Sequence, residues 1–486
     1  MPRQHIVKSV FWLTAAEIIF NLSGYIVHSG VGRILGPAEY GRYGLVITLT
    51  TMIIMLIGRG IPSAMNKYIS EISDTKPGLV RLIKKQAIIA QTILISSITI
   101  IFYLLAPVIA LALKDPTLTP LFRLSSLIIP AFAAASFYFY YYTGIHRFNV
   151  QSALKVVRSV AKIMFIIGLA YLFKVKGSVI GYIAAPLLVF FVAWIIDKVW
   201  ISKKFFDNKD YDFDWHKLIS YAWPITLFML FYEILITVDL YFVKAMLQND
   251  FLTGIYNGAL TIGRIPYYLF YALTIVLLPT ISKTTFQNDI KETKKVISQS
   301  LRFMIMLLLP ITILMFVYAE PIINIFYGAG YEQAVPPMQV LVFGVGFLTV
   351  FYVMSFVFNG AGLVRIPMYI ALVGMIAKIM LNYVLIQTHG IMGSAIATSI
   401  VSVFIMATML FYIHRHFQGL IKLTSLLKML IATLLMYSLS FFFPSQNLMF
   451  VVWSIVLTAF YLLILYILQE IKKEDLDLLK KLASKK

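Results

Sequence analysis

The chain contains no cysteine, few charged residues, and about half as many acids as bases, 21 against 41. The lack of cysteine excludes disulfides, thiolate zinc sites, iron–sulfur clusters and cysteine nucleophiles. Charged residues make up only 13% of the 486 residues, compared with roughly 25% in an average soluble domain. The sequence also lacks a Walker loop, a G-x-S-x-G elbow, an HExxH pair and an acid-rich cation site. We therefore expect neither an enzyme nor a protein that needs a metal or another cofactor.

Hydrophobic residues dominate the composition, at 60% of the chain with a mean hydropathy of +0.87. A membrane-spanning helix needs about 20 mostly apolar residues, and such stretches recur along the whole sequence, separated by short loops. The first of them, residues 7–32, is too long for a signal peptide and has no small-residue cleavage site. The sequence thus predicts an all-α integral membrane protein with about 14 transmembrane helices, the first of which is retained.

The net charge of +20 has its simplest explanation in membrane topology. When the N-terminus is placed in the cytoplasm, most Lys and Arg residues fall in segments on that same side, as the positive-inside rule requires. We therefore predict a multi-pass protein of the cell (plasma) membrane with both termini cytoplasmic. Membrane lipids are expected partners and nucleic acid is not.

A weak internal repeat divides the chain into two halves. Residues 161–164, AKIM, recur at 377–380, and the Gly-Ser pair at 177–178 recurs at the same separation, at 393–394. A six-helix unit returns the chain to its starting side, so the halves share one orientation and form two pseudo-symmetric lobes. The predicted parts are an N-lobe (1–200), a linker (201–216), a C-lobe (217–415), two further helices (416–468) and an amphipathic or disordered cytoplasmic tail (469–486).

Several polar residues lie inside predicted spans, where a charge costs about 2.5–3.5 kcal/mol on insertion scales. Some repeat at helical spacing along one face, which indicates either a cavity lining or polar contacts between helices. We favour a cavity lining, because each such face carries a charge. The predicted substrate-binding residues are Arg59, Arg264, Lys162, Lys378, Asn21, Asn257 and Tyr268, and the predicted coupling residues are Glu17, Asp239 and Glu233.

An aromatic run, FYFYYY at residues 137–142, ends the fourth predicted helix. Tyr and Trp often form belts where a helix leaves the bilayer, and this is the simpler interpretation. The alternative is a surface on which sugars stack at a lateral opening.

Three segments resemble one transporter family. They are ILGPAEYGRYG at 34–44, LPTISK at 278–283 and FYGAGY at 326–331. Together with the helix number and order, they make the chain similar to the polysaccharide transporter family of the multidrug/oligosaccharidyl-lipid/polysaccharide (MOP) exporter superfamily, which includes the Wzx-type O-antigen flippases.

The resemblance implies two six-helix lobes around a cavity lined by helices 1, 2, 7 and 8, and the transfer of polyprenyl-linked oligosaccharide to the outer leaflet. Arg59 and Arg264 match the family's cationic cavity on helices 2 and 8. Lys378 precedes Asn382 where some relatives hold a coupling cation, and we hypothesise that its ammonium replaces that cation beside Asp239. Glycan polymerase or transferase machinery is a further implied partner. A cation-coupled multidrug exporter of the same superfamily is the alternative function.

Overall fold

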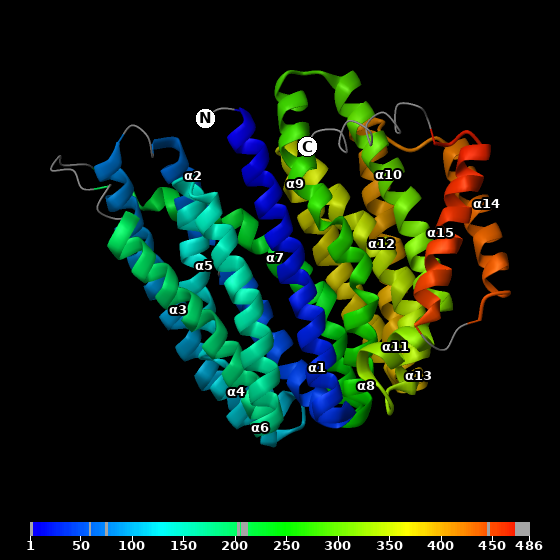
Figure 1. Ribbon diagram of the computed structural model, residues 1–486, viewed down its shortest axis with the longest axis horizontal. Helices are drawn as coiled ribbons and strands as arrows, with labels where there is room; N and C mark the ends of the chain where they lie inside the picture. The colour runs from blue at the N-terminus through cyan, green and yellow to red at the C-terminus, as the bar shows by residue number, and fades with distance from the viewer. Residues whose placement is uncertain are drawn as a thin grey trace. The chain divides into compact units, whose positions relative to one another are not determined.

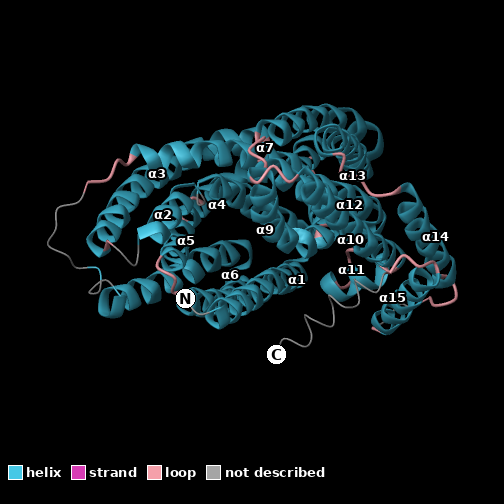
Figure 2. Cartoon of the chain, turned by 90° about the horizontal axis from the view of Figure 1, so that it is seen from above, coloured by secondary structure: helices cyan, strands magenta, loops and turns pink. Residues whose placement is uncertain are grey.

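The computed structural model describes residues 3–57, 60–72, 76–201, 205, 212–444 and 448–471, which form helices joined by short connections, with no strand among them (Figures 1 and 2). The helices of the first half are α1 (Arg3–Ile57), α2 (Gly60–Ile72), α3 (Pro77–Ala112), η1 (Pro116–Leu118), α4 (Thr119–Ser125), α5 (Ile128–Gly144), α6 (Phe148–Ile196), the π-helical η2 (Asp197–Ile201), α7 (His216–Leu247) and α8 (Asp250–Gly263). Those of the second half are α9 (Ile265–Phe286), α10 (Ile290–Val317), α11 (Ala319–Tyr327), η4 (Glu332–Ala334), α12 (Val335–Gly360), α13 (Arg365–Phe417), α14 (Leu423–Ser440) and α15 (Met449–Ile467).

Within the described residues, nine helical segments are long and apolar enough to cross a membrane. Three of them are too long for a single crossing and contain a break with non-helical backbone. The breaks lie at Gly36 in α1, at Phe173 and Lys174 in α6, and at Gly390 in α13. Gly36 has a φ of 70°, which glycine adopts without the steric penalty of a Cβ. The predicted all-helical, multi-pass membrane architecture is confirmed.

The chain divides into two compact units, Met1–Asn257 and Gly258–Lys486. In the first unit, α1 packs along α6 and α7, while α5 lies against α2 and α6. In the second unit α12 is the central helix, and it packs against α9, α10 and α13. The lobe boundaries expected from the repeat stay a prediction.

The sequence repeat places a similar tight turn in each unit. A Cβ added at Gly177 would collide with the carbonyl oxygen of Leu169, four residues before the break in α6. A Cβ at Gly393 would likewise collide with the carbonyl oxygen of Leu385, before the break in α13. The equivalent glycines therefore let two segments of one long helix approach each other closely, once in each unit.

The aromatic run at 137–142 lies in the interior of the first unit. Five of its six side chains are at most 9% exposed, and only Tyr140 is partly exposed. Tyr138 and Tyr141 pack against an ion pair between Lys84 and Asp197, with the Lys84 ammonium 5.4 Å and 4.0 Å from their ring centroids. Both interpretations offered from the sequence, an interfacial belt and a sugar-stacking surface, are wrong, because five of the six rings are buried inside the first unit.

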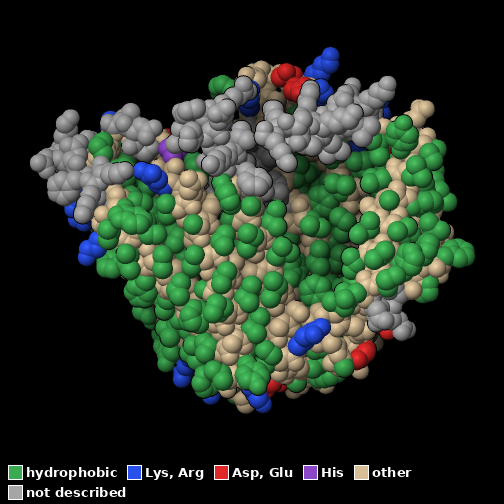
Figure 3. All heavy atoms as spheres, in the orientation of Figure 1, with side chains coloured by type: hydrophobic (Ala, Val, Ile, Leu, Met, Phe, Trp, Pro, Cys, Tyr) green, Lys and Arg blue, Asp and Glu red, His purple; other side chains and the backbone are tan. Residues whose placement is uncertain are grey.

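The outer surface of the described helices is largely apolar. In the view of Figure 3, hydrophobic side chains cover the middle of the face, and Lys and Arg side chains lie mainly toward its upper and lower margins. Helices α14 and α15 pack on each other and on α10, and most of their remaining surface is exposed and apolar. A buried ion pair between Arg302 and Glu470, with 2.7 Å from Nε to Oε1, joins α10 to the end of α15.

Candidate functional site

The polar face predicted on the first helix lies partly against α6. Glu17 forms an ion pair with Lys155, and the backbone of Gly24 lies beside the ammonium of Lys162, which a Cβ on Gly24 would approach to 3.4 Å. Gly24 follows Glu17 by seven residues, and Lys162 follows Lys155 by seven. The two helices therefore run in the same direction with their contacting faces in register. Polar contact between helices therefore explains Glu17 and Gly24, while Asn21 is only partly buried.

Two cations near Lys162 were missed from the sequence. Lys155 and Arg158 are not among the site residues predicted from the sequence, yet both lie within α6, on the face that carries Lys162. Arg158 is only 6% exposed. Arg158 and Lys162 follow Lys155 by three and seven residues, and this helical spacing is the sequence signal that could have identified the row.

Farther along α1, the polar face continues into a network of rings. The Nδ1 atom of His28 lies 2.9 Å from the hydroxyl oxygen of Tyr40, and the hydroxyls of Tyr43 and Tyr182 lie 3.0 Å apart. Tyr40 and Tyr43 are fully buried and their rings are stacked. The network joins both segments of α1 to α6.

The predicted coupling residues of α7 are buried in the first unit. Asp239 is completely buried, and its carboxylate accepts hydrogen bonds from the Tyr256 hydroxyl at 3.0 Å and from the Leu240 N–H at 3.1 Å. Glu233 is 8% exposed. Asn257 on α8 is 3% exposed and packs against Gly44, where a Cβ would overlap its side-chain amide.

In the second unit, Lys378 is 2% exposed on α13. One turn later, the Asn382 amide donates to the Lys378 carbonyl oxygen at 2.9 Å and its own oxygen accepts from the Ser394 hydroxyl at 2.7 Å. Arg264 is the single residue between α8 and α9. Tyr268, in the first turn of α9, is 42% exposed.

Within the first unit, Glu17 and Lys162 lie on the neighbouring helices α1 and α6, and Asp239 lies with Tyr256 of α8. Within the second unit, Lys378 lies with Asn382 on α13. The placement of the Lys378 ammonium beside Asp239 stays a prediction. Arg59 falls outside the described residues. Among the residues that are described, no group of three His, Asp or Glu side chains is arranged to hold a metal ion.

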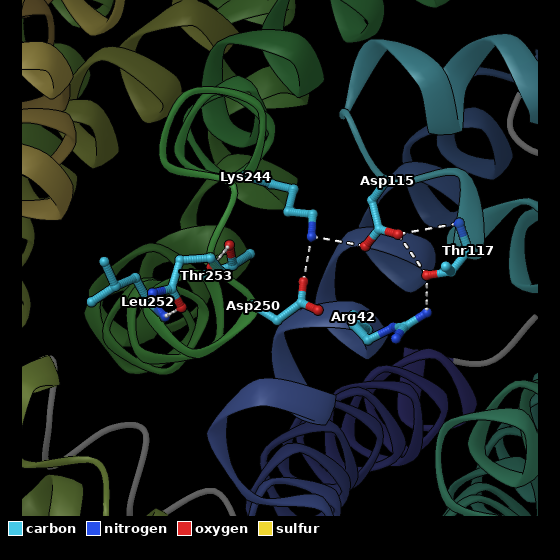
Figure 4. A network of polar contacts seen from close by, with 8 residues as sticks. Arg42, Asp115, Thr117, Lys244, Asp250, Leu252 and Thr253 are labelled. Carbon is cyan, nitrogen blue, oxygen red and sulfur yellow. Dashed lines mark hydrogen bonds and ion pairs between the residues drawn. The ribbon is translucent and has the colours of Figure 1, made fainter.

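A second ionic group, unrecognised from the sequence, joins four segments of the first unit (Figure 4). The Lys244 ammonium, at the end of α7, lies 2.8 Å from Asp115 and 2.5 Å from Asp250. Asp115 also accepts a hydrogen bond from Thr117, whose hydroxyl in turn accepts one from Arg42 at 2.7 Å. The network thereby connects α1, the turn before η1, α7 and the first turn of α8.

The charge state of Asp115 follows from these contacts. Burial raises the pKa of its carboxyl, but hydrogen bonds from Lys244 and Thr117 and the positive charges of Lys244 and Arg42 lower it by more. The pKa of Asp115 consequently lies below its ordinary value of 3.8. The Asp115 carboxylate is thus ionised at neutral pH.

Comparison with known proteins places this arrangement in a family. The model of the polysaccharide biosynthesis protein family matches residues 6–285, and the MatE model matches 219–384. Among curated relatives, an uncharacterized membrane protein of Methanocaldococcus jannaschii is 24% identical over 421 residues, covering 82% of this chain and 81% of the relative. Stage V sporulation protein B of Bacillus subtilis is 24% identical over 447 residues, covering 84% and 83%.

Solved structures show the same fold. The lipid II flippase MurJ in an inward closed conformation aligns with a TM-score of 0.75 at 18% identity, covering 94% of this chain and 98% of MurJ. An inward-facing multidrug resistance MATE transporter of the MOP superfamily aligns with a TM-score of 0.70 at 14% identity, covering 85% and 98%. Because the family model spans more than half of the chain, the protein belongs to the polysaccharide biosynthesis protein family, and its described helices make it a multi-pass membrane protein.

Proposed function

We propose that this protein is a transporter of the MOP superfamily, a flippase that moves polyprenyl-(pyro)phosphate-linked oligosaccharide from the cytoplasmic to the outer leaflet by alternating access. The observation that carries the proposal is the row of basic side chains on α6, which faces α1 and has Glu17 as its acidic partner among the described residues. Arg can bind phosphate through two parallel hydrogen bonds and Lys as a point charge. We also propose glycan polymerase or transferase machinery as a partner of the transporter.

A cation-coupled multidrug exporter is the second candidate, and the match of the MatE model over 219–384 favours it. Such a protein needs acidic side chains that are free to attract cationic drugs. In the first unit, however, Glu17 is paired with Lys155, and Asp239 accepts two hydrogen bonds. This distribution of charge supports an anionic substrate.

The first experiment measures thermal stability of the purified protein with polyprenyl pyrophosphate-linked oligosaccharide. A ligand that binds the folded state at 100 times its dissociation constant stabilises it by about 2.7 kcal/mol. We expect the parent protein to be stabilised, and Arg264→Ala and Arg59→Ala to reduce this effect, because both remove a cation proposed to bind phosphate. Stabilisation by hydrophobic cations, with no response to the glycolipid, would instead favour the drug exporter.

The predicted coupling role of three acidic residues needs a transport assay. We propose Glu17, Asp239 and Glu233 as residues that couple transport to an ion gradient, with Asp239 the strongest because it is completely buried. Asp239→Asn keeps the size of the side chain and removes its charge. We expect it to reduce gradient-driven flipping in proteoliposomes at least tenfold, while Glu292→Gln, at an exposed position, does not. Equal responses of both variants to imposed proton and sodium gradients would rule out this role.

A further inference from the structure

Three basic residues occupy one face of α6, at positions i, i+3 and i+7: Lys155, Arg158 and Lys162. That face packs along α1, which lies beside α6 in the first unit (Figures 1 and 2). With a rise of about 1.5 Å per residue, the row extends over about 10 Å of helix. Phe20 of α1 is common to all three, since its ring centroid lies 5.5, 5.3 and 4.8 Å from the three cationic groups in turn.

Arg158 is enclosed by aromatic rings. The carbon of its guanidinium lies 4.0 Å from the ring centroid of Phe132 and 5.7 Å from that of Phe139, both on α5. These rings attract the cation through their negative faces. They do not neutralise it, and among the described residues no acidic side chain forms an ion pair with Arg158. A guanidinium that is 6% exposed therefore keeps an uncompensated positive charge.

Lys162 is more exposed than Arg158. Its side chain, like that of Lys155, is only partly buried, and no acid pairs with it in the described part of the chain. On the α1 side it faces Gly24, whose missing side chain leaves room beside the ammonium. Side chains four residues apart on a helix have Cβ atoms about 6 Å apart. One phosphate group can therefore contact Arg158 and Lys162 together.

Glu17 is the acid of this group. It pairs with Lys155 at one end of the row, and its side chain is 35% exposed. The row thus combines three basic groups with one acidic partner. Buried charges are costly unless they are paired, so the excess of basic groups over acids indicates that the site is completed by an anion.

We propose that Lys155, Arg158 and Lys162 form a binding site for a phosphate-type anion on α6, and that Glu17 occupies its Lys155 end when the anion is absent. This inference rests on the proposed function and deepens it by locating a phosphate site on α6 of the first unit. Glu17 competes with the anion for Lys155, so entry of the anion releases the carboxylate.

The test is a binding titration of the purified full-length protein with farnesyl diphosphate, with inorganic diphosphate and farnesol in parallel. We expect Arg158→Gln and Lys162→Gln to weaken binding of farnesyl diphosphate at least tenfold, and Glu17→Gln to strengthen it several-fold by freeing Lys155. The matched control is Arg123→Gln, because Arg123 also lies over an aromatic ring, 5.2 Å from Tyr103, but is exposed on α4. Lys162→Gln guards against misfolding of Arg158→Gln, since Lys162 is less buried.

The outcomes separate this site from the proposed function. Wild-type affinity in both Lys162→Gln and Arg158→Gln overturns the site, even where the protein flips lipid-linked oligosaccharide. Failure of the parent to bind either diphosphate also overturns it, as does a loss in Arg123→Gln equal to that in the α6 variants. Diphosphate binding that depends on α6, in a protein that flips no glycolipid, supports the site and removes the proposed function. Inorganic diphosphate binding as tightly as farnesyl diphosphate identifies a free phosphate compound as the ligand, whereas preference for the farnesyl form identifies a lipid.

Discussion

Replacing Lys244 with methionine is expected to lower the free energy of unfolding by about 3–5 kcal/mol, the cost of removing one partner from a buried ionic group. The ammonium side chain is 4% exposed and contacts two carboxylates, those of Asp115 and Asp250. Methionine keeps most of the volume and removes the charge. Two acids then remain partly buried, without their shared cation and close to each other. Unfolding of the detergent-solubilised protein by SDS, followed by circular dichroism, measures the effect.

The pH dependence of this variant distinguishes lost charge from lost packing. In the parent, the lowered pKa of Asp115 means that its contacts stabilise the folded chain above the ordinary value of 3.8, and that this contribution is lost as the pH falls through the folded value. In Lys244→Met the strongest lowering contacts are gone, and burial favours the protonated acid. The deficit should therefore be largest at neutral pH and shrink as the pH approaches 4.

Two controls accompany the Lys244 variant. Lys295→Met removes a surface cation that lies 4.0 Å from Glu292, with both side chains about half exposed, and should cost at most about 0.5 kcal/mol. Adding Asp115→Asn and Asp250→Asn to Lys244→Met should recover part of the lost stability, because the uncompensated charges disappear. A deficit that is independent of pH and unaffected by these amides would contradict the ionic explanation.

Helical architecture was predictable because it depends on composition and spacing, which the sequence shows directly. The repeat was predictable for the same reason, and its Gly-Ser pairs at 177–178 and 393–394 fall just after the breaks in α6 and α13. The positions of Glu17 and Lys162 within spans also followed from counting residues. The neighbours that they contact did not, because a polar face on one helix contains no information about which other helix it meets.

The misassigned residues share a cause. Lys155 and Arg158 lie close to the start of an apolar stretch, where basic residues are usually cytoplasmic. In the structure α6 begins at Phe148, and the guanidinium of Arg158 packs against the rings of neighbouring phenylalanines. The tyrosines at 138, 141 and 142 were misjudged similarly, because an aromatic belt and a buried aromatic cluster have the same local sequence. Long-range packing distinguishes them, and here the distant partner is Asp197.

Gly254 is a position where even an alanine substitution should lower the stability of the protein strongly. In the first unit, the start of α8 crosses the second segment of α1 so closely that a Cβ at Gly254 would collide with the carbonyl oxygen of Pro37 and lie 3.0 Å from the Gly41 nitrogen. A Cβ added at Gly41 would in turn lie only 2.7 Å from the backbone nitrogen of Gly254 on α8. Small residues allow such close helix contacts in membrane proteins. Because backbone atoms lie on both sides, no side chain can rotate away.

Gly254→Ala is therefore expected to destabilise the protein by about 3 kcal/mol, at the upper end of the usual cost of overpacking, although alanine favours a helix over glycine by about 1 kcal/mol. The matched control is Gly168→Ala on α6, where an added Cβ meets nothing within 4 Å, so that variant should be neutral or slightly more stable. Apparent melting temperatures in detergent compare the two. Equal melting temperatures for both variants would mean that α1 and α8 separate at little cost, and the close crossing would then be one of several arrangements that the chain visits rather than a fixed contact.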